Sequence, residues 1–186
     1  MHVAILAAGF GGQGIKLFSQ LLGSALTLEG KNATMYADYK DEIRGGAIQC
    51  TTQVSDGEIW APTVLEHDVL VAMNEDALRF YESTVKPGGL IIYNSSIINI
   101  QPKRTDVEAV ALPANQFAEE LGSVQVASMV ALGALSEKTG LFKIESVVSV
   151  LTDLLPPYRH KLIPYNQKAL ECGRDFIRNG KYAVTR

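Results

Sequence analysis

Residues 3–14 read Val-Ala-Ile-Leu-Ala-Ala-Gly-Phe-Gly-Gly-Gln-Gly, an apolar run that passes directly into a glycine loop. After the loop, apolar residues recur at three- and four-residue steps up to Gly30, which predicts an amphipathic helix. A strand, a glycine loop and a helix in this order form an arrangement that can bind an anion. The glycines let the backbone turn tightly, and the helix N-terminus presents unpaired N–H groups.

The loop also satisfies G-x-G-x-x-G, the spacing of dinucleotide-binding loops, although that pattern alone is weak. The same glycines also suit close packing of a helix against a strand. We favour backbone that faces a phosphate group. The loop therefore supplies the first candidate cofactor-binding residues: Gly9, Gly11, Gly12, Gln13 and Gly14.

The pattern changes after the first helix. We expect a second strand at 33–36, a polar loop over 37–44 that ends at Gly45-Gly46, and then a hairpin. Its strands are expected at 47–54 and 58–60, on either side of the turn Ser55-Asp56-Gly57. A hairpin at this point is an antiparallel insertion, where a dinucleotide-binding domain would ordinarily make a second helical crossover.

Strand and helix patterns alternate along the rest of the chain. We expect strands at 68–73, 90–93 and 107–112, a turn at 85–89, and helices at 74–81, 115–121, 126–138, 144–155 and 164–178. This order predicts an α/β fold, a three-layer α/β/α arrangement with a mostly parallel sheet and an antiparallel hairpin near residues 46–60. Its 186 residues are expected to form one domain, 1–186.

Composition excludes several classes of function. The net charge is −3 with both signs mixed along the chain, so we expect neither nucleic acid nor a membrane as a partner. The longest apolar stretch, 126–135, falls short of the about 20 residues that a bilayer requires, and we expect a cytoplasmic protein. Cys50 and Cys172 stand apart, and the histidines show no metal-ligand spacing. We therefore expect neither catalytic nor metal-binding residues on this chain.

Ligands of open α/β sheets sit beyond the carboxyl ends of the strands, so the loops after the strands hold the remaining candidates. Arg44 lies beside Gly45 and Gly46, where a planar anion could approach and accept two hydrogen bonds, or it pairs with Asp41 or Glu42 and only fixes the loop. Polar side chains after two later strands could contact a ligand or simply cap helices. The candidates from these loops are Arg44, Gly45, Gly46, Asn74, Asn94 and Ser95.

Asp38 leaves a nicotinamide-dependent reductase open, because an acidic residue after the second strand can bind the ribose hydroxyls. It is equally a turn or cap residue.

Taken together, several motifs resemble the gamma subunits of 2-oxoacid:ferredoxin (or acceptor) oxidoreductases, the family of pyruvate and ketoisovalerate oxidoreductases. The same motifs also resemble domain III of the single-chain pyruvate:ferredoxin oxidoreductases. The family often has Asn where this chain has Ser128, and Ser where it has Asp41. The motifs are Gly9-x-Gly11-Gly12-Gln13-Gly14, Tyr39-Lys40-Asp41-Glu42-Ile43-Arg44-Gly45-Gly46, Asp68-Val69-Leu70-Val71-Ala72-Met73-Asn74, Lys86-Pro87-Gly88-Gly89, Tyr93-Asn94-Ser95 and Met129 to Leu135.

The resemblance implies a heteromeric enzyme that converts a 2-oxoacid, coenzyme A and oxidised ferredoxin into an acyl-CoA, carbon dioxide and reduced ferredoxin. Thiamine diphosphate, Mg²⁺ and iron–sulfur clusters would then lie on partner subunits. The implied partners are alpha and beta (thiamine-binding) subunits and a ferredoxin-like delta subunit, so the chain would not be active alone. The glycine loop and Arg44 would help to hold coenzyme A at the subunit junction.

Three other identities stay open at this point. They are the small subunit of an indolepyruvate oxidoreductase, a stand-alone NAD-dependent reductase, and a scaffold subunit without a ligand. Neither the 2-oxoacid nor the electron acceptor follows from the sequence, and the glycine loop could contact coenzyme A, thiamine diphosphate or only a partner chain.

Overall fold

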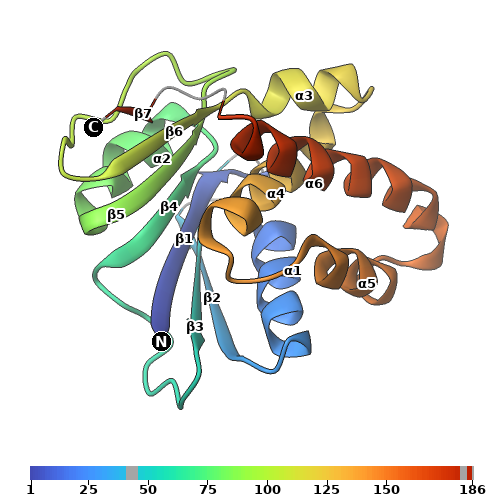
Figure 1. The fold of residues 1–186 in the computed structure, drawn as a ribbon, viewed down its shortest axis with the longest axis horizontal. Coiled ribbons are helices and arrows are strands. Elements are labelled where there is room, and N and C mark those ends of the chain that lie inside the picture. Colours follow the sequence, from blue (N-terminus) through green and yellow to red (C-terminus); the bar gives the residue numbers. More distant parts are fainter. Residues whose placement is uncertain (41–45, 181–183, 186) are drawn as a thin grey trace.

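The fold is described from a computed structural model that covers residues 1–40, 46–180 and 184–185. A mixed sheet runs through these residues in the strand order β2-β3-β1-β4-β5-β6-β7 (Figure 1). The strands are β1 (His2–Phe10), β2 (Asn32–Lys40), β3 (Ala47–Ser55), β4 (His67–Ala72), β5 (Val85–Asn94), β6 (Glu108–Leu112) and β7 (Val184–Thr185).

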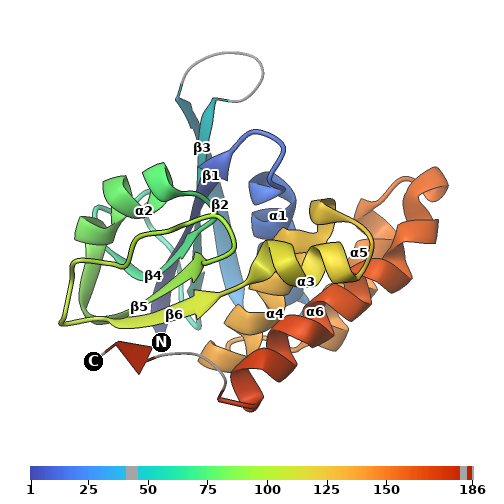
Figure 2. The ribbon, with the colours of Figure 1, turned by 90° about the horizontal axis from the view of Figure 1, so that it is seen from above.

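Helices cover both faces of this sheet, so the expected three layers are confirmed (Figure 2). The α-helices are α1 (Ile15–Leu28), α2 (Glu75–Tyr81), α3 (Ala114–Glu120), α4 (Ala127–Thr139), α5 (Ile144–Leu154) and α6 (Ile163–Arg178), and the 3₁₀ segments are η1 (Glu82–Thr84), η2 (Val124–Val126) and η3 (Pro157–Leu162). Of the α-helices in the part of the chain that the structure describes, α2 lies on one face and the others lie on the opposite face.

The parallel centre of the sheet consists of β1, β4, β5 and β6. Successive side chains of a strand point to opposite faces, and both faces of β4 are buried. Val69 and Val71 pack against the thick layer, which is the layer formed by α1, α3, α4, α5 and α6. Leu70 and Ala72 pack on the face that α2 covers. The continuous apolar run expected at 68–73 reflects this burial. All four strands end at the same edge, which places the loops after them side by side.

The antiparallel hairpin exists, but its second strand is not the one expected. β3 pairs with β2 on one side and with β1 on the other, both antiparallel, whereas residues 58–60 form no strand. β2 is also longer than expected, because it continues through residues 37–40, where a loop was predicted. The sheet is therefore mixed, with parallel strands in the centre and antiparallel strands on both flanks, including the unanticipated β7.

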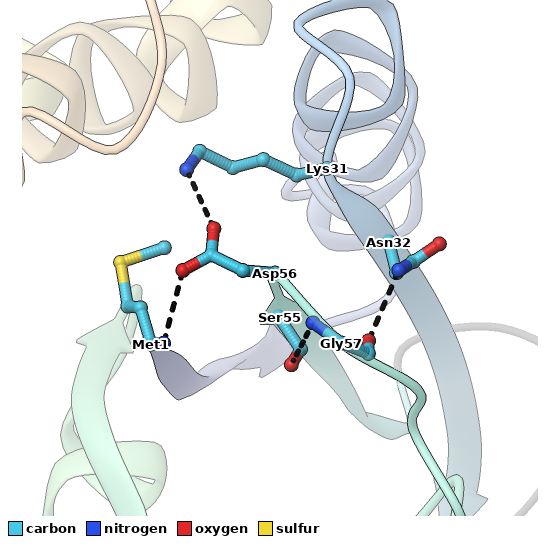
Figure 3. Close-up of polar contacts among 6 residues, drawn as sticks. All are labelled: Met1, Lys31, Asn32, Ser55, Asp56 and Gly57. Carbon is cyan, nitrogen blue, oxygen red and sulfur yellow. Dashed lines mark hydrogen bonds and ion pairs between the residues drawn. The ribbon is translucent and has the colours of Figure 1, made fainter.

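The hairpin turn expected at Ser55-Asp56-Gly57 is not formed, because Ser55 ends β3 and residues 58–60 after the bend at Asp56 and Gly57 form no strand. This bend instead contacts two other segments, Met1 and residues 31–32 (Figure 3). The Asp56 carboxylate lies 2.9 Å from the amino group of Met1 and 3.4 Å from Lys31 Nζ. Asn32 donates a hydrogen bond of 3.0 Å to the carbonyl of Gly57. These contacts fasten the starts of β1 and β2 to the end of β3, and the Met1 amino group and Lys31 lower the pKa of Asp56.

Helices α4 and α6 pack at very short range in the thick layer. A Cβ on Gly133 would collide with the backbone of Leu170, and one on Gly173 with the backbone of Val130. Gly133, in the Met129 to Leu135 segment that resembles the family, therefore has a packing role, since only glycine lets the two helices approach this closely.

Smaller differences concern element ends. The residues of the turn expected at 85–89 belong to β5, and α3 starts after Pro113 at Ala114, one residue before the expected start. The expected helices at 126–138, 144–155 and 164–178 correspond to α4, α5 and α6 within one residue at each end.

Candidate functional site

Gln13 organises the glycine loop after β1. Its Oε1 accepts a hydrogen bond of 2.7 Å from the Phe10 amide, and its Nε2 donates one of 2.9 Å to the carbonyl of Met73. The first bond closes the loop on itself, and the second ties it to the end of β4. The only amide side chain in the loop thus fixes its shape, a role that the sequence pattern does not reveal.

Asn74 continues this arrangement from the β4 side. Its Nδ2 donates a hydrogen bond of 3.2 Å to Gln13 Oε1, while its Oδ1 accepts one of 2.8 Å from the amide of Ala77. The second bond caps α2, as the capping alternative for Asn74 requires. The side chain is buried and both its polar atoms are engaged, so Asn74 positions the loop; direct contact with a ligand stays a prediction.

At two positions of the loop, Gly9 and Gly14, close neighbours leave no space for a side chain. A Cβ on Gly9 would lie 2.6 Å from Gln13 Oε1, and one on Gly14 would lie 2.5 Å from Ser128 Oγ. Gly14 is also the N-cap of α1 and has a φ of 78°, a conformation that glycine adopts most readily. Ser128, where the family pattern often has Asn, therefore sits directly behind the loop. The packing alternative holds at these two positions without excluding a ligand at the others.

The structure brings the glycine loop and the second glycine motif together. The Gly11 amide donates a hydrogen bond of 3.0 Å to the carbonyl of Gly46. Gly46 is therefore a neighbour of the loop, as a common anion-binding rim requires. Arg44 and Gly45 lie outside the described residues, as do Asp41 and Glu42, the proposed alternative partners of Arg44.

Several backbone donors at this site are open. Within the described ranges, the amides of Gly12 and Gly14 and those of residues 15–17 at the start of α1 donate to no acceptor, whereas the Phe18 amide already donates to the carbonyl of Gly14. The first turn of α1 contains no acidic residue, and Lys16 there is exposed. An unpaired helix N-terminus next to a lysine favours a negative charge. In contrast, the amides of Phe10, Gly11 and Gln13 are already bonded to protein oxygens.

A small pocket of about 120 Å³ lies beside the loop, on the α2 side of the sheet. Phe10 and Phe80 line it and expose 37% and 72% of their surface, which is high for aromatic side chains. The pocket therefore offers an apolar surface next to the open backbone donors. Its lining consists of Gly9, Phe10, Ala47, Ile48, Asn74, Asp76, Ala77, Phe80 and Tyr81.

The loop after β5 has a different organisation. Asn94 Nδ2 donates a hydrogen bond of 2.8 Å to Asn115 Oδ1, and Ser96 Oγ accepts one of 3.0 Å from the Gln116 amide. The amide of Ser95 extends the sheet through its bond of 2.9 Å to the carbonyl of Leu112. Asn94 and Ser96 thus hold the start of α3, as their capping alternative suggests. Asn94 and Ser95 lie two strands away from the glycine loop, on the same edge.

Asp38 is part of β2 and forms a cross-strand pair. Its Oδ2 accepts a hydrogen bond of 2.8 Å from Gln49 Nε2, and the two residues face each other in the β2–β3 register. β2 and β3 are antiparallel neighbours, whereas the helical crossover of a dinucleotide-binding domain joins parallel strands. The ribose-binding interpretation of Asp38 therefore has no support from the geometry.

Cysteines, metal clusters and membrane spans can be assessed for the described residues. Cys50 is buried, Cys172 is half-buried, and both are free thiols whose pKa is raised by burial. In the ranges that the structure covers, no three side chains of His, Cys, Asp or Glu gather as a metal site would require. No helix among them combines the length and apolar character of a membrane span.

Many phosphate- and nucleotide-binding domains share this architecture, an α/β/α domain with a glycine loop at the carboxyl edge of its parallel strands. Comparison with known proteins gives the family. The pyruvate ferredoxin/flavodoxin oxidoreductase family matches residues 4–176, and the chain belongs to it.

Relatives of similar length support this assignment. The 2-oxoglutarate synthase subunit KorC of Methanothermobacter thermautotrophicus is 36% identical over 183 residues, which cover 95% of each chain. The gamma subunit of the keto/oxoacid ferredoxin oxidoreductase of Geobacter sulfurreducens superposes with a TM-score of 0.81 at 26% identity, over 94% of this chain and 95% of that one. The family resemblance inferred from the sequence motifs is confirmed.

A longer protein contains a similar domain. The 2-oxoglutarate:ferredoxin oxidoreductase of Magnetococcus marinus, solved with 2-oxoglutarate, coenzyme A and succinyl-CoA bound, has a TM-score of 0.87 at 26% identity. The match covers 96% of the present chain but 31% of that one. The same fold thus occurs both as a separate chain and as part of a larger polypeptide.

Proposed function

We propose that this chain is the gamma subunit of a heteromeric 2-oxoacid:ferredoxin oxidoreductase and that its glycine loop holds coenzyme A at a subunit junction. The observation that carries the second part is the set of unpaired amides at Gly12, Gly14 and residues 15–17. Coenzyme A carries a diphosphate, and backbone N–H groups at a helix N-terminus bind such a group well. The relative from Magnetococcus marinus was solved with coenzyme A bound, which supports the choice of ligand.

Gln13 and Asn74 prepare the loop for this ligand. Because their side chains fix the backbone before any ligand arrives, binding does not have to order the loop. Arg44 donates charge-assisted hydrogen bonds to the diphosphate in this proposal, and the apolar pocket at Phe10 and Phe80 takes an uncharged part of the coenzyme. Asn94 and Ser95 form the far end of the same edge.

Decarboxylation and electron transfer belong to partner subunits in this proposal. Thiamine diphosphate with Mg²⁺ and the iron–sulfur clusters lie on the alpha, beta and ferredoxin-like delta subunits, and ferredoxin is the acceptor. The chain is one domain, works in the cytoplasm and has no activity alone. Since KorC and the Magnetococcus marinus protein are both named for 2-oxoglutarate, we take 2-oxoglutarate as the substrate of the complex.

The test is the substitution Arg44→Ala in the purified, assembled complex. A charge-assisted hydrogen bond contributes about 1.5–3 kcal/mol, so the KM for coenzyme A should rise roughly tenfold or more. The decarboxylation half-reaction, measured without coenzyme A, should keep its rate. Arg79→Ala is the matched control, because Arg79 is an exposed arginine that pairs with Glu75 on α2.

The other identities predict different outcomes. Equal loss of both half-reactions in Arg44→Ala would assign Arg44 to assembly and contradict the coenzyme A site. Saturable binding of NADH to the purified chain, measured by calorimetry, would favour a stand-alone reductase. A complex that uses indolepyruvate in preference to 2-oxoglutarate would identify the indolepyruvate branch of the family.

A further inference from the structure

A second groove, of about 620 Å³, lies on the helical face between the start of α1, the α3–η2 connection and the η3–α6 segment. Its size is that of small-molecule sites. None of the residues identified above in the glycine loop or at Gly46 lines it. The lining consists of Leu17, Leu121, Gly122, Ser123, Gln125, Val126, Leu155, Arg159, Lys161, Leu162, Tyr165 and Asn166.

The charge in this groove has one sign. Arg159 and Lys161 line it, and no Asp or Glu does. Among the described residues, neither cation forms an ion pair; the Arg159 guanidinium only stacks on the Tyr158 ring, 5.6 Å from its centroid. The other four arginines in the described ranges each pair with a carboxylate, whereas Arg159 and Lys161 are exposed without a carboxylate partner, so both charges are available to an external anion.

The segment that carries the cations is held in place. His160, between them, lies 2.8 Å through its Nε2 from the carbonyl of Leu155, which anchors η3 to the end of α5. Asn166 donates a hydrogen bond of 2.9 Å from its Nδ2 to the carbonyl of Leu162 and is buried. Its Oδ1 accepts no hydrogen bond from the described residues, so an acceptor remains in the groove wall.

The rest of the wall is apolar. Leu121, Val126 and Leu155 contribute aliphatic surface, and the ring of Tyr165 is 48% exposed at the rim. A ligand that fits this wall therefore combines an anionic group with an apolar or aromatic body and a hydrogen-bond donor. Inorganic phosphate would use only the cations and leave the wall uncovered.

We propose that this groove binds an organic phosphate of nucleotide size, with its phosphate between Arg159 and Lys161 and its base or another apolar body against the wall. Two sources share this chemistry: a free adenine nucleotide, and the nucleotide end of a coenzyme A molecule that extends from the glycine loop past Leu17. The first goes beyond the proposed function, and the second rests on it.

The experiment measures the affinity of the full chain for ADP and for coenzyme A by calorimetry. The test variant is Arg159→Gln/Lys161→Gln, and the matched control is Lys168→Gln, an exposed lysine on α6 outside the groove. We expect the double variant to weaken binding about tenfold or more, because both charged donors are lost, and the control to leave it unchanged. Circular dichroism and urea midpoints check that all variants fold.

Each outcome either distinguishes a free adenine nucleotide from coenzyme A as the ligand or contradicts binding in this groove. ADP binding that the double variant weakens identifies a nucleotide site, and loss of coenzyme A binding alone identifies the nucleotide end of the coenzyme. The groove proposal is overturned if neither ligand binds or if the double variant binds both as tightly as the wild type. If Arg44→Ala weakens coenzyme A binding while the double variant does not, the glycine-loop proposal stands without the groove.

Discussion

The side-chain amide of Asn74 donates a hydrogen bond of 3.2 Å to Gln13 Oε1, across 61 positions of sequence. The bond joins the loops after two neighbouring parallel strands, β1 and β4. Since Gln13 Oε1 also accepts the Phe10 amide, one oxygen holds both loops. The shape of the candidate coenzyme A loop therefore depends on a residue of the neighbouring strand.

A double-mutant cycle measures this dependence. Gln13→Ala removes three hydrogen bonds and should lower the unfolding free energy by about 1–3 kcal/mol. Asn74→Ala should lower it by about 1 kcal/mol for the lost helix cap, and further for the lost hydrogen bond to Gln13. Urea unfolding of both single variants and the double variant should give a coupling energy of at least about 0.5 kcal/mol. Strict additivity would mean that the shared bond contributes nothing. Gln116→Ala, which removes an exposed glutamine, is the control and should change stability by less than about 0.5 kcal/mol.

Gly14→Ala tests the close approach of Ser128 to the glycine loop. The new Cβ would lie 2.5 Å from Ser128 Oγ and would sit on a backbone with a φ of 78°. We expect a loss of about 1–3 kcal/mol, measured by urea unfolding. Adding Ser128→Ala removes the oxygen and should recover only part of the loss, because the backbone conformation stays unfavourable. Full recovery would show that φ is unimportant at Gly14.

Gly133→Ala should disrupt the packing of α4 on α6. The new methyl group meets backbone atoms of Leu170, so the helices must separate, and we expect a loss of about 1–3 kcal/mol or more. Gly23→Ala is the matched control inside α1, because nothing lies within 4 Å of its Cβ position. Alanine is the better helix former there and should stabilise the protein by about 0.5–1 kcal/mol. Thermal unfolding of both variants compares the two effects, and equal shifts would contradict the packing argument.

The buried His67 side chain should make the stability of the protein depend on pH. The Thr84 hydroxyl donates to the carbonyl of Tyr81, so it accepts from His67 Nδ1 at 3.1 Å, and Nε2 remains as the acceptor for Thr51. This arrangement holds a neutral imidazole, and burial lowers the pKa of His67 below its ordinary 6.5. As the pH falls below 6.5, the unfolded chain binds the proton first, so stability declines until the folded-state pKa is passed.

The measurement compares the unfolding free energy of the wild type with that of His67→Gln between about pH 7.5 and about pH 5.5. The variant has no imidazole to protonate, so its stability should decline less over this range. A parallel decline in both proteins would assign the pH dependence to other groups.

Local periodicity was sufficient to predict most of the fold. The apolar spacing of α1, the Asn74 cap of α2 and the unbroken apolar run of β4 each identify their element without reference to the rest of the chain. The partner of β3 was predicted wrongly, because strand pairing depends on register between segments and a single strand pattern does not contain it. The polar residues 38–40 of β2 also resembled a loop, although pairing with β3 keeps them extended.

The candidate site divides in the same way. The glycine loop and the second glycine motif were identified from residue type, and the Gly11–Gly46 hydrogen bond confirms that they are neighbours. The contact between Gly14 and Ser128 was missed because it spans more than half of the chain. Its one signal was the departure from the family pattern at Ser128. The groove at Arg159 could not be foreseen either, since its wall combines four separate segments.

The ion pair between the Met1 amino group and Asp56 has a practical consequence for handling the protein. An affinity tag fused ahead of Met1 would turn that ammonium into an uncharged amide and leave Lys31 as the remaining cation beside the carboxylate. Because this pair is exposed and the β1–β3 and β2–β3 ladders still hold the junction, a tag at this end should change the stability little, and unfolding of tagged and untagged protein compares the two.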